Sequence, residues 1–386
     1  MDVLKEIAKR AKEVDGQVMS YLEGNDGKKL MLAVRHYPSA GGKRLRPVMA
    51  EVIAEAVGKA GTKAVPFAVS LELIHNFTLV HDDVMDNDSM RRGRPAVHVL
   101  FDVPTAIIAG DALFARAFEV LSETEIAPEH MPRLLNLTAH TVWLIAEGQQ
   151  EDMDFEDIPA DRLSMDDYME MIYKNTAVLF ECAAEGGTLI AGGTEEQVRS
   201  MKEYARLLGM GFQVWDDILA LTGDEKKLGK PVGNDIRNGK RTMIVLYALH
   251  SMKESDPRRK TLLKALGNAK ATPEEITAAI EALKDCGAID HAFNTAKEYA
   301  VKAKKELECL PPSKEKEFLS MVMDFAVGRS SKQPMPSAVM WKSAIRPSGR
   351  WRDLISTARR FPVPRALSTR TMSLELWCRA CPPSAS

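Results

Sequence analysis

Two carboxylates at helical spacing, Asp82 and Asp86, are the residues of this chain best suited to metal chemistry, and they lie in the segment HDDVMD at residues 81–86. Residues four apart on an α-helix lie about 40° apart around its axis and about 6 Å apart along it. Carboxylates that close repel each other unless a cation lies between them. Mg²⁺ suits this position, because it typically binds one or two carboxylates together with phosphate oxygens. The alternative is a solvated acidic helix end, which is common on surfaces.

The arginines that follow this acidic pair favour a phosphate ligand over a metal cage alone. Arg91, Arg92 and Arg94 come shortly after Asp86, where the helical pattern ends. Guanidinium groups bind phosphate oxygens through forked hydrogen bonds. The two features together suit a diphosphate that is held by metal on one side and by arginine on the other.

The same order of acidic helix and basic loop occurs a second time. Asp216 and Asp217 lie in a helical segment, and Lys230 and Lys240 come after them. A third segment, GGKRLRP at 41–47, places two glycines and several cations just before a helix, where the backbone can approach an anion closely. A basic turn alone is a common surface feature, but the three segments together predict a diphosphate site.

The elements that must position these residues are predicted to be helices. Apolar residues recur at helical spacing up to about residue 330, and alternating β-branched runs are few, so the fold class is all-α. Thr194 with Gln197 and Thr272 with Glu275 form expected capping boxes at helix starts. Helices are expected at 2–23, 46–59, 64–85, 104–122, 130–155, 166–191, 195–221, 241–252, 273–286, 288–309 and 314–329, with loops at 87–103 and 222–239.

Composition limits the possible function classes. A net charge of -2 and a pI near 6.5 argue against nucleic-acid binding through bulk charge. Five cysteines, an odd number, suit a reducing compartment, and the CxxC at 378–381 lacks the partners of a zinc site. The sequence has neither the apolar core of a signal peptide nor an apolar run of about 18 residues, so we expect a cytoplasmic protein without a transmembrane segment.

The C-terminal part of the sequence differs from the rest. Residues 332–386 contain ten Lys and Arg against two Asp and Glu, and they hold seven prolines and three tryptophans without a sustained period. We therefore expect one domain over residues 1–331, followed by a basic tail over 332–386 that is disordered or a non-native extension. A membrane-surface anchor built from Trp and Arg is the alternative.

The chain resembles a known family through four motifs in the right order. The resemblance is to the trans-isoprenyl diphosphate synthases, or polyprenyl synthetases, and covers about residues 1–330; it is carried by GGKRLRP, HNFTLVHDDVMDNDSMRRGRP, AIIAGDALFARAF and GFQVWDDILALTGDEKKLGKPVGNDI. It implies a helical bundle around a deep central cavity, usually in a homodimer, with the two Asp motifs facing each other. It also implies an enzyme that joins isopentenyl diphosphate to an allylic diphosphate with Mg²⁺, three ions per active site.

The resemblance also assigns roles to individual residues. The Mg²⁺ ligands would be Asp82, Asp86 and Asp216, with Asp83 and Asp217 assisting from just outside the metal's ligand shell. The allylic diphosphate would be surrounded by Arg91, Lys174, Thr176, Gln213, Lys230 and Lys240. Isopentenyl diphosphate would be held by Lys43, Arg46, His75 and Arg92. Without the motif, His75 would be interpreted as a core histidine.

Phe77 and Thr78 are expected to set the product length. Phe77 lies five residues before Asp82, about 7.5 Å along the helix axis, where a growing chain should point. In the family a bulky residue there forms a floor, and Phe77 beside Thr78 resembles the archaeal type of geranylgeranyl diphosphate synthase. A twenty-carbon product from dimethylallyl, geranyl or farnesyl diphosphate is therefore expected. A farnesyl or mixed farnesyl and geranylgeranyl diphosphate synthase is the alternative.

Two departures from the family pattern bear on this interpretation. Ala220 stands where many relatives carry a third Asp, and the Lys-Thr pair of the family appears as Lys174-Asn175-Thr176, with the cation displaced by one residue.

Two other functions remain as alternatives. One is a class I terpene cyclase, but a cyclase has no use for a second diphosphate site. The other is a non-catalytic partner subunit, but such subunits commonly lose Asp or Arg ligands that persist here.

Overall fold

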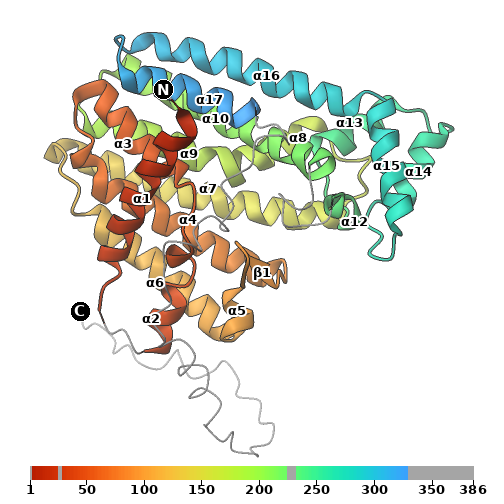
Figure 1. Cartoon of the computed structure of the whole chain (residues 1–386), viewed down its shortest axis with the longest axis horizontal. Helices are drawn as coiled ribbons and strands as arrows, with labels where there is room; N and C mark the ends of the chain where they lie inside the picture. Colours follow the sequence, from red (N-terminus) through yellow and green to blue (C-terminus); the bar gives the residue numbers. More distant parts are fainter. Residues whose placement is uncertain (1, 25–27, 224–231, 329–386) are drawn as a thin grey trace, which may run out of the picture. The chain divides into compact units, whose positions relative to one another are not determined.

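The computed structural model describes residues 2–24, 28–223 and 232–328, and over these residues the chain is all-α, as predicted (Figure 1). Within the described residues, strand structure is confined to one antiparallel hairpin, β1 (Met90–Arg91) and β2 (Arg94–Pro95). The helices are α1 (Val3–Tyr21), α2 (Lys29–Val34), η1 (Pro38–Ala40), α3 (Leu45–Gly58), η2 (Thr62–Ala64), α4 (Val65–Met85), α5 (Val97–Leu100), α6 (Val103–Leu121), η3 (Pro128–His130), α7 (Met131–Asp157), α8 (Met165–Ile172), η4 (Tyr173–Ala177), α9 (Val178–Ile190), α10 (Glu195–Thr222), α12 (Asn234–Arg237), α13 (Met243–Ser251), α14 (Pro257–Ala265), α15 (Pro273–Asp285), α16 (Ala288–Glu306), η5 (Leu307–Cys309) and α17 (Lys314–Gly328).

The differences from the sequence-based expectation concern short elements. Helices α2, α5, α12 and α14 lie in segments without a predicted helix. They have four to nine residues, which is too few for an amphipathic period to show. The predicted helix 166–191 is divided into α8 and α9 by η4, a single π-helical turn.

Capping residues fix several helix starts. The predicted capping boxes of Thr194 with Gln197 and of Thr272 with Glu275 begin α10 and α15. A further capping box begins α8, where Ser164 pairs with an aspartate instead of Glu or Gln. Each such cap satisfies backbone N–H groups that would otherwise lack partners, and is worth about 1 kcal/mol.

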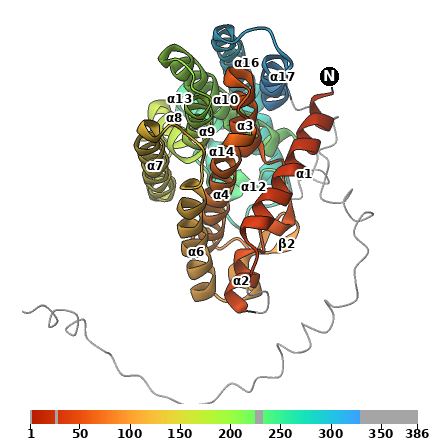
Figure 2. The same ribbon diagram turned by 90° about the vertical axis from the view of Figure 1, so that its left-hand side faces the viewer.

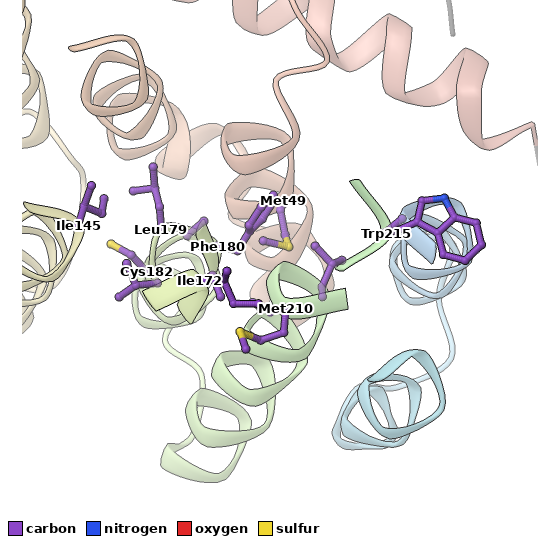
Figure 3. Packing of buried hydrophobic residues seen from close by; sticks show 14 of the residues in the cluster. Met49, Ile145, Ile172, Leu179, Phe180, Cys182, Met210 and Trp215 are labelled. Carbon is purple, nitrogen blue, oxygen red and sulfur yellow. The ribbon is translucent and has the colours of Figure 1, made fainter. Parts of the chain in front are cut away.

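Helices α4 and α10 carry the acidic motifs, and each packs along its own pair of neighbouring helices. Helix α4 lies along α6 and α3, whereas α10 lies along α9 and α16 (Figure 2). Helix α9 is buried over its whole length, as expected for a helix that is apolar on nearly all sides. Figure 3 shows Leu179, Phe180 and Cys182 of α9 packed with Met49 of α3 and Met210 of α10. The same apolar core includes Leu73 and Ile74 of α4, so it joins the helices of both motifs.

Two glycines allow the π-helical turn η4 to be enclosed by its neighbours. A Cβ atom at Gly148 of α7 would lie 2.7 Å from the backbone nitrogen of Asn175, and one at Gly209 of α10 would lie 2.6 Å from Cα of Ala177. Any larger residue at either position would push the helices apart. The close approach fixes the position of Thr176, one of the predicted site residues.

Helices of the described parts of the chain are not long and apolar enough to cross a membrane. The proposed basic tail, residues 332–386, lies outside the described residues, as does the predicted ligand Lys230. The division into a domain at 1–331 and a tail therefore stays a prediction.

Candidate active site

The first acidic pair lies at the C-terminal end of α4. Asp82 is in the last helical turn, and Asp86 caps the helix. Burial, and then the neighbouring Asp86, raises the pKa of Asp82 to about 7. Burial, and then Asp152 of α7 and Asp88, raises the pKa of Asp86 to about 6. Negative charge is therefore crowded here, and a cation between these carboxylates would relieve it.

Asp83, between them, has a different environment. Its side chain is fully buried, and its two oxygens accept hydrogen bonds from the Tyr37 hydroxyl and from the Arg91 guanidinium. The Arg91 Nε–Asp83 Oδ1 distance is 2.6 Å. Burial, and then the Asp83 carboxylate, raises the pKa of Tyr37, so this hydroxyl stays a donor. Asp83 therefore fixes the position of the Arg91 guanidinium.

A tight hairpin turn places Arg91 and Arg92 beside the end of α4. Arg92 and Gly93 form its two-residue loop, and both have positive φ, 53° and 73°. This combination is typical of a type I′ turn. Nη1 of Arg92 donates a hydrogen bond of 2.8 Å to the Gly41 carbonyl, which holds an arginine in a backbone conformation that it rarely adopts.

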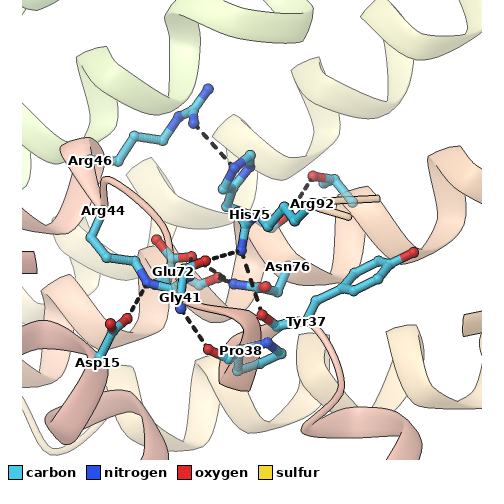
Figure 4. A network of polar contacts seen from close by, with 11 residues as sticks. Asp15, Tyr37, Pro38, Gly41, Arg44, Arg46, Glu72, His75, Asn76 and Arg92 are labelled. Carbon is cyan, nitrogen blue, oxygen red and sulfur yellow. Dashed lines mark hydrogen bonds and ion pairs between the residues drawn. The ribbon is translucent and has the colours of Figure 1, made fainter. Parts of the chain in front are cut away.

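The segment GGKRLRP brings a second group of cations next to α4. Nη1 of Arg46 lies 3.4 Å from Nε2 of His75 (Figure 4). The guanidinium lies 4.4 Å from the centre of the Phe180 ring. Burial lowers the pKa of Arg46 to about 10, and burial and then Arg46 and Arg92 lower that of His75. Among the described residues, the buried Nε of Arg46 has no hydrogen-bond partner. An anion would stabilise this cluster.

Lys43, the other predicted cation of this segment, lies close to α17. Its ammonium group is 5.3 Å from the centre of the Phe325 ring. A cation–π contact of this kind is worth about 0.5–1 kcal/mol at a partly exposed site. The structure thus places Lys43 at the edge of the Arg46 segment, next to the C-terminal helix of the described chain.

The second acidic pair repeats the arrangement seen around Asp83. Asp217 is buried and accepts hydrogen bonds from Tyr168, at 2.5 Å, and from Gln213, at 3.1 Å, while Nζ of Lys240 lies 3.9 Å away. Thr176 in turn donates to the Gln213 side-chain oxygen, at 2.9 Å. Burial raises the pKa of Asp217 to about 6, although Lys240 and Tyr168 act against it. The structure therefore brings three predicted site residues, Thr176, Gln213 and Lys240, together with the buried carboxylate of Asp217.

Charges on α7 connect the two motifs. Asp152 raises the pKa of both Asp82 and Asp86, and the same carboxylate interacts with Lys240 beside the second motif. Burial opposes the charge on Lys240, yet four carboxylates that include Asp217 and Asp152 raise its pKa overall. The two acidic motifs thus contribute to one electrostatic environment.

Lys174 is directed elsewhere. Its ammonium group binds Glu151, lies 2.9 Å from Glu170 and lies 3.9 Å from Glu147. Hydrogen bonds to Glu151 and then to Glu170 raise its pKa. All three glutamates are on α7 and α8. Lys174 and Thr176 lie in the same π-helical turn, but Thr176 binds Gln213, whereas the ion pairs of Lys174 go to α7 and α8 and do not join the Gln213–Asp217 chain.

The predicted floor residues lie on α4 as expected. The Phe77 ring makes an edge contact with Phe114 of α6, with centroids 5.3 Å apart, and a similar contact with His81 at 5.8 Å. Thr78 donates a hydrogen bond to the His75 carbonyl, at 2.9 Å. Phe77 therefore stands at the α4–α6 junction, where an aromatic side chain can limit the space beneath Asp82.

Sequence reasoning missed several residues that the structure places at the site. Tyr37 and Tyr168 are buried tyrosines whose hydroxyls bind the motif aspartates, and Asp152 and Glu72 add buried or partly buried negative charge. Tyr37 lies outside the predicted helices, and Tyr168 resembles an ordinary core residue. Asp152 had a weak signal, because it lies in the acidic end of a predicted helix.

The carboxylates of the first motif fit a hard divalent cation. Within the described residues, no three His, Cys, Asp or Glu side chains already converge as a metal site. A cation here would therefore bind Asp82 and Asp86 together with oxygens of a ligand, which is the coordination that Mg²⁺ commonly accepts. The raised pKa values of both groups have the sign expected for carboxylates short of a cation.

Fold and site together define a class of protein: an all-helical protein with two acidic motifs in one electrostatic environment and a buried arginine cluster nearby. Comparison with known proteins gives the family, because the model of the polyprenyl synthetase family matches residues 27–283. The chain belongs to this family and is a prenyltransferase.

Relatives and solved structures agree over most of the chain. The geranylgeranyl diphosphate synthase of Methanosarcina mazei is 40% identical over 329 residues, which cover 85% of this chain and 98% of the relative. The crystal structure of geranylgeranyl pyrophosphate synthetase from Pyrococcus horikoshii matches with a TM-score of 0.80 at 40% identity, covering 85% of this chain and 99% of that one. A polyprenyl synthase from Caulobacter crescentus, complexed with calcium and isoprenyl diphosphate, matches with a TM-score of 0.73 at 33% identity, covering 85% and 97%.

Proposed function

We propose that the chain is a short-chain synthase that condenses isopentenyl diphosphate with allylic diphosphates up to farnesyl diphosphate and releases geranylgeranyl diphosphate. The observation that carries this proposal is that the structure has one cluster of carboxylates, at Asp82 and Asp86, and one cluster of cations, around Arg46. Neighbouring carboxylates add to burial in raising the pKa of Asp82 and Asp86, whereas the guanidinium of Arg46 lies against His75 and Phe180 and its buried Nε has no hydrogen-bond partner among the described residues. One site suits a metal-bound diphosphate, and the other suits a diphosphate bound without metal.

The allylic diphosphate would be held at the acidic motifs. Asp82, Asp86 and Asp216 would hold Mg²⁺, and the calcium in the related Caulobacter structure supports a divalent cation in this family. Mg²⁺, three ions in our proposal, would neutralise the leaving diphosphate and so ease ionisation of the allylic C–O bond. Arg91 and Lys240 would bind the outer phosphate oxygens, and Lys230, which lies outside the described residues, would join them.

Isopentenyl diphosphate would be held at the Arg46 cluster. Arg46, His75, Arg92 and Lys43 would bind its diphosphate and direct its double bond toward the allylic carbon. The double bond attacks the carbocation, a new C–C bond forms, and a proton then leaves for the released diphosphate. The residues around the reacting carbons must exclude water, because water would trap the cation.

The product length would be limited at the α4–α6 junction. Phe77 would close the space below Asp82, with Thr78 beside it and Phe114 of α6 behind it. The two relatives described as geranylgeranyl diphosphate synthases support a twenty-carbon product. An Ala at position 77 should release longer products.

A second copy of the chain is the proposed partner, in a homodimer that acts in the cytoplasm. Helix α6 exposes apolar side chains on successive turns, among them Val103, Ile107 and Ile108, and Trp143 of α7 is 65% exposed. Apolar surface of this extent is typical of an interface. Light scattering on the purified protein should give twice the chain mass, whereas a monomer would contradict the proposal.

One incubation separates the proposed function from its rivals. Purified protein is mixed with isopentenyl diphosphate and farnesyl diphosphate, with and without Mg²⁺. A twenty-carbon diphosphate formed only with Mg²⁺ supports the proposal. A cyclic hydrocarbon would indicate a terpene cyclase, and absence of turnover would indicate a non-catalytic subunit.

A further inference from the structure

Arg44, which lies between the two predicted ligands Lys43 and Arg46, points away from them into the protein. It is 3% exposed, and its backbone is left-handed, with φ 47° and ψ 39°. This conformation costs an L-residue other than glycine about 1 kcal/mol or more. A buried charge in a strained backbone persists only when surrounding contacts determine it strongly.

Those contacts come from three separate elements. Nε of Arg44 lies 2.7 Å from Asp15 of α1, Nη1 binds Glu72 of α4, and Nη2 donates a 2.6 Å hydrogen bond to the Pro38 carbonyl of η1 (Figure 4). Glu72 is itself held by the side-chain amide of Asn76, at 2.7 Å. The network therefore fastens the segment 41–47 to α1, η1 and α4 at once.

The network also keeps its carboxylates away from the cation cluster while their charge remains nearby. Glu72 is buried at 2% exposure and forms its ion pair with Arg44. Its charge nevertheless acts favourably on Arg46 and on Arg92, although burial dominates the pKa of both. Arg46 thus gains a compensating charge nearby without losing its hydrogen-bond donors to a carboxylate, and these donors remain for an anion.

We propose that Arg44, with Asp15 and Glu72, is a positioning unit that presets Lys43 and Arg46 for the diphosphate of isopentenyl diphosphate, and that α1 is thereby part of this binding site. The inference rests on the proposed function. Arg44 does not touch the substrate in this proposal. It acts through the backbone on either side of it, where a displacement of about 1 Å can lower the rate by about a hundredfold.

The test compares two variants of the unit with a matched control. Arg44→Gln removes the central charge, and Asp15→Asn removes one anchor whose side chain is 26% exposed, so that Asp15→Asn remains a test if Arg44→Gln fails to fold. Glu55→Gln is the control, because Glu55 of α3 pairs with Arg10 at 2.9 Å, so this ion pair also fastens α1 but lies outside the segment 41–47. Steady-state kinetics with isopentenyl and farnesyl diphosphates, and calorimetric binding of isopentenyl diphosphate alone, are measured for each.

The proposal requires that the variants change the KM for isopentenyl diphosphate and leave the KM for farnesyl diphosphate nearly unchanged. The KM for isopentenyl diphosphate should rise about tenfold in Asp15→Asn and about a hundredfold in Arg44→Gln, while the KM for farnesyl diphosphate changes less than twofold. Asp15→Glu should recover most of the loss, and Glu55→Gln should resemble wild type. Equal rises in both KM values would overturn the positioning role. A rise in the KM for isopentenyl diphosphate alone in Glu55→Gln would overturn it as well. If wild type itself forms no prenyl product, the proposed function fails, and calorimetry with isopentenyl diphosphate still tests the positioning unit.

Discussion

The two acidic motifs use the same local design with a different charge balance. In each, one aspartate is buried and accepts a hydrogen bond from a buried tyrosine: Asp83 from Tyr37, and Asp217 from Tyr168. Each of these aspartates also has a basic partner, Arg91 at the first motif and Lys240 at the second. From this repeated design we propose that the buried carboxylate places a basic side chain, Arg91 or Lys240, and does not bind the metal directly.

The two motifs differ in the charges around the carboxylates that lie next to the buried aspartates. Arg91 is bound closely by Asp83, so Asp82 and Asp86 are left beside further acids and have raised pKa values. At the second motif Lys240 stands 3.9 Å from Asp217 and also interacts with Asp216. The first motif therefore depends more on an added cation, and the second already contains part of its compensation.

Removing a carboxylate that we propose as a metal ligand should test this asymmetry most strongly. We expect Asp82→Asn to lower kcat/KM by about a thousandfold and Asp216→Asn by about a hundredfold, the range seen when one group that stabilises a developing charge is lost. Turnover of farnesyl and isopentenyl diphosphates over a series of Mg²⁺ concentrations measures both. Equal losses in the two variants would show that the motifs bind metal to the same extent.

Substitution of the buried aspartates should have a smaller and different effect. Asp83→Asn and Asp217→Asn should each raise the KM for farnesyl diphosphate about ten- to hundredfold, because Arg91 or Lys240 loses the partner that orients it. Tyr37→Phe and Tyr168→Phe keep the charge of the buried aspartate and should raise this KM by a smaller factor. The Mg²⁺ concentration that gives half-maximal rate should hardly change. A large shift in that concentration for Asp83→Asn would make Asp83 a metal ligand and would end the parallel between the motifs.

Stability as a function of pH should distinguish the first motif from buried acids elsewhere. The pKa of Asp82 is about 7 in the folded chain and about 4 when unfolded, so the folded state binds more protons and the free energy of unfolding falls as pH rises from about 4 to 7. Mg²⁺ favours the ionised form and should restore stability above pH 7. Thermal denaturation at pH 5 and 8, with Mg²⁺ or with a chelator, measures this.

Glu51 supplies a matched control for that experiment. It is a buried carboxyl on α3 whose pKa is raised to about 7 by burial and then by Glu55. Both Glu51→Gln and Asp82→Asn should weaken the pH dependence. Only Asp82→Asn should also lose most of the gain from Mg²⁺, and a retained gain in that variant would place the metal elsewhere.

Sequence alone predicts the helices and the acidic pairs because both are local patterns. The spacing of Asp82 and Asp86 and the capping boxes at Thr194 and Thr272 depend on neighbours within one or two turns. Tyr37 reaches Asp83 across 46 residues of chain, and Arg44 reaches Glu72 across 28, so neither contact leaves a periodic trace in the sequence. The roles of these buried partners become visible only when the helices are packed.

The smallest expected effect concerns Lys174, where family resemblance and geometry disagree. Resemblance assigns it to the allylic diphosphate, but its ammonium group is held by Glu147, Glu151 and Glu170. If these ion pairs persist during turnover, Lys174→Met should change the KM for farnesyl diphosphate by less than twofold. Loss of a partly exposed ion-pair group should lower Tm by only about 2 °C.

Asn175 provides the complementary test of the same position. It directly precedes Thr176, whose hydroxyl is bound to Gln213 beside the second motif. Asn175→Lys would add a cation one residue closer to that chain, and we expect it to lower the KM for farnesyl diphosphate by about two- to fivefold, the gain of a partly exposed charge pair. A large loss of affinity in Lys174→Met, with no gain in Asn175→Lys, would instead mean that Lys174 leaves its glutamates to bind the substrate. The second motif would then use a lysine that must exchange its ion pairs, whereas Arg91 of the first motif is already held by Asp83.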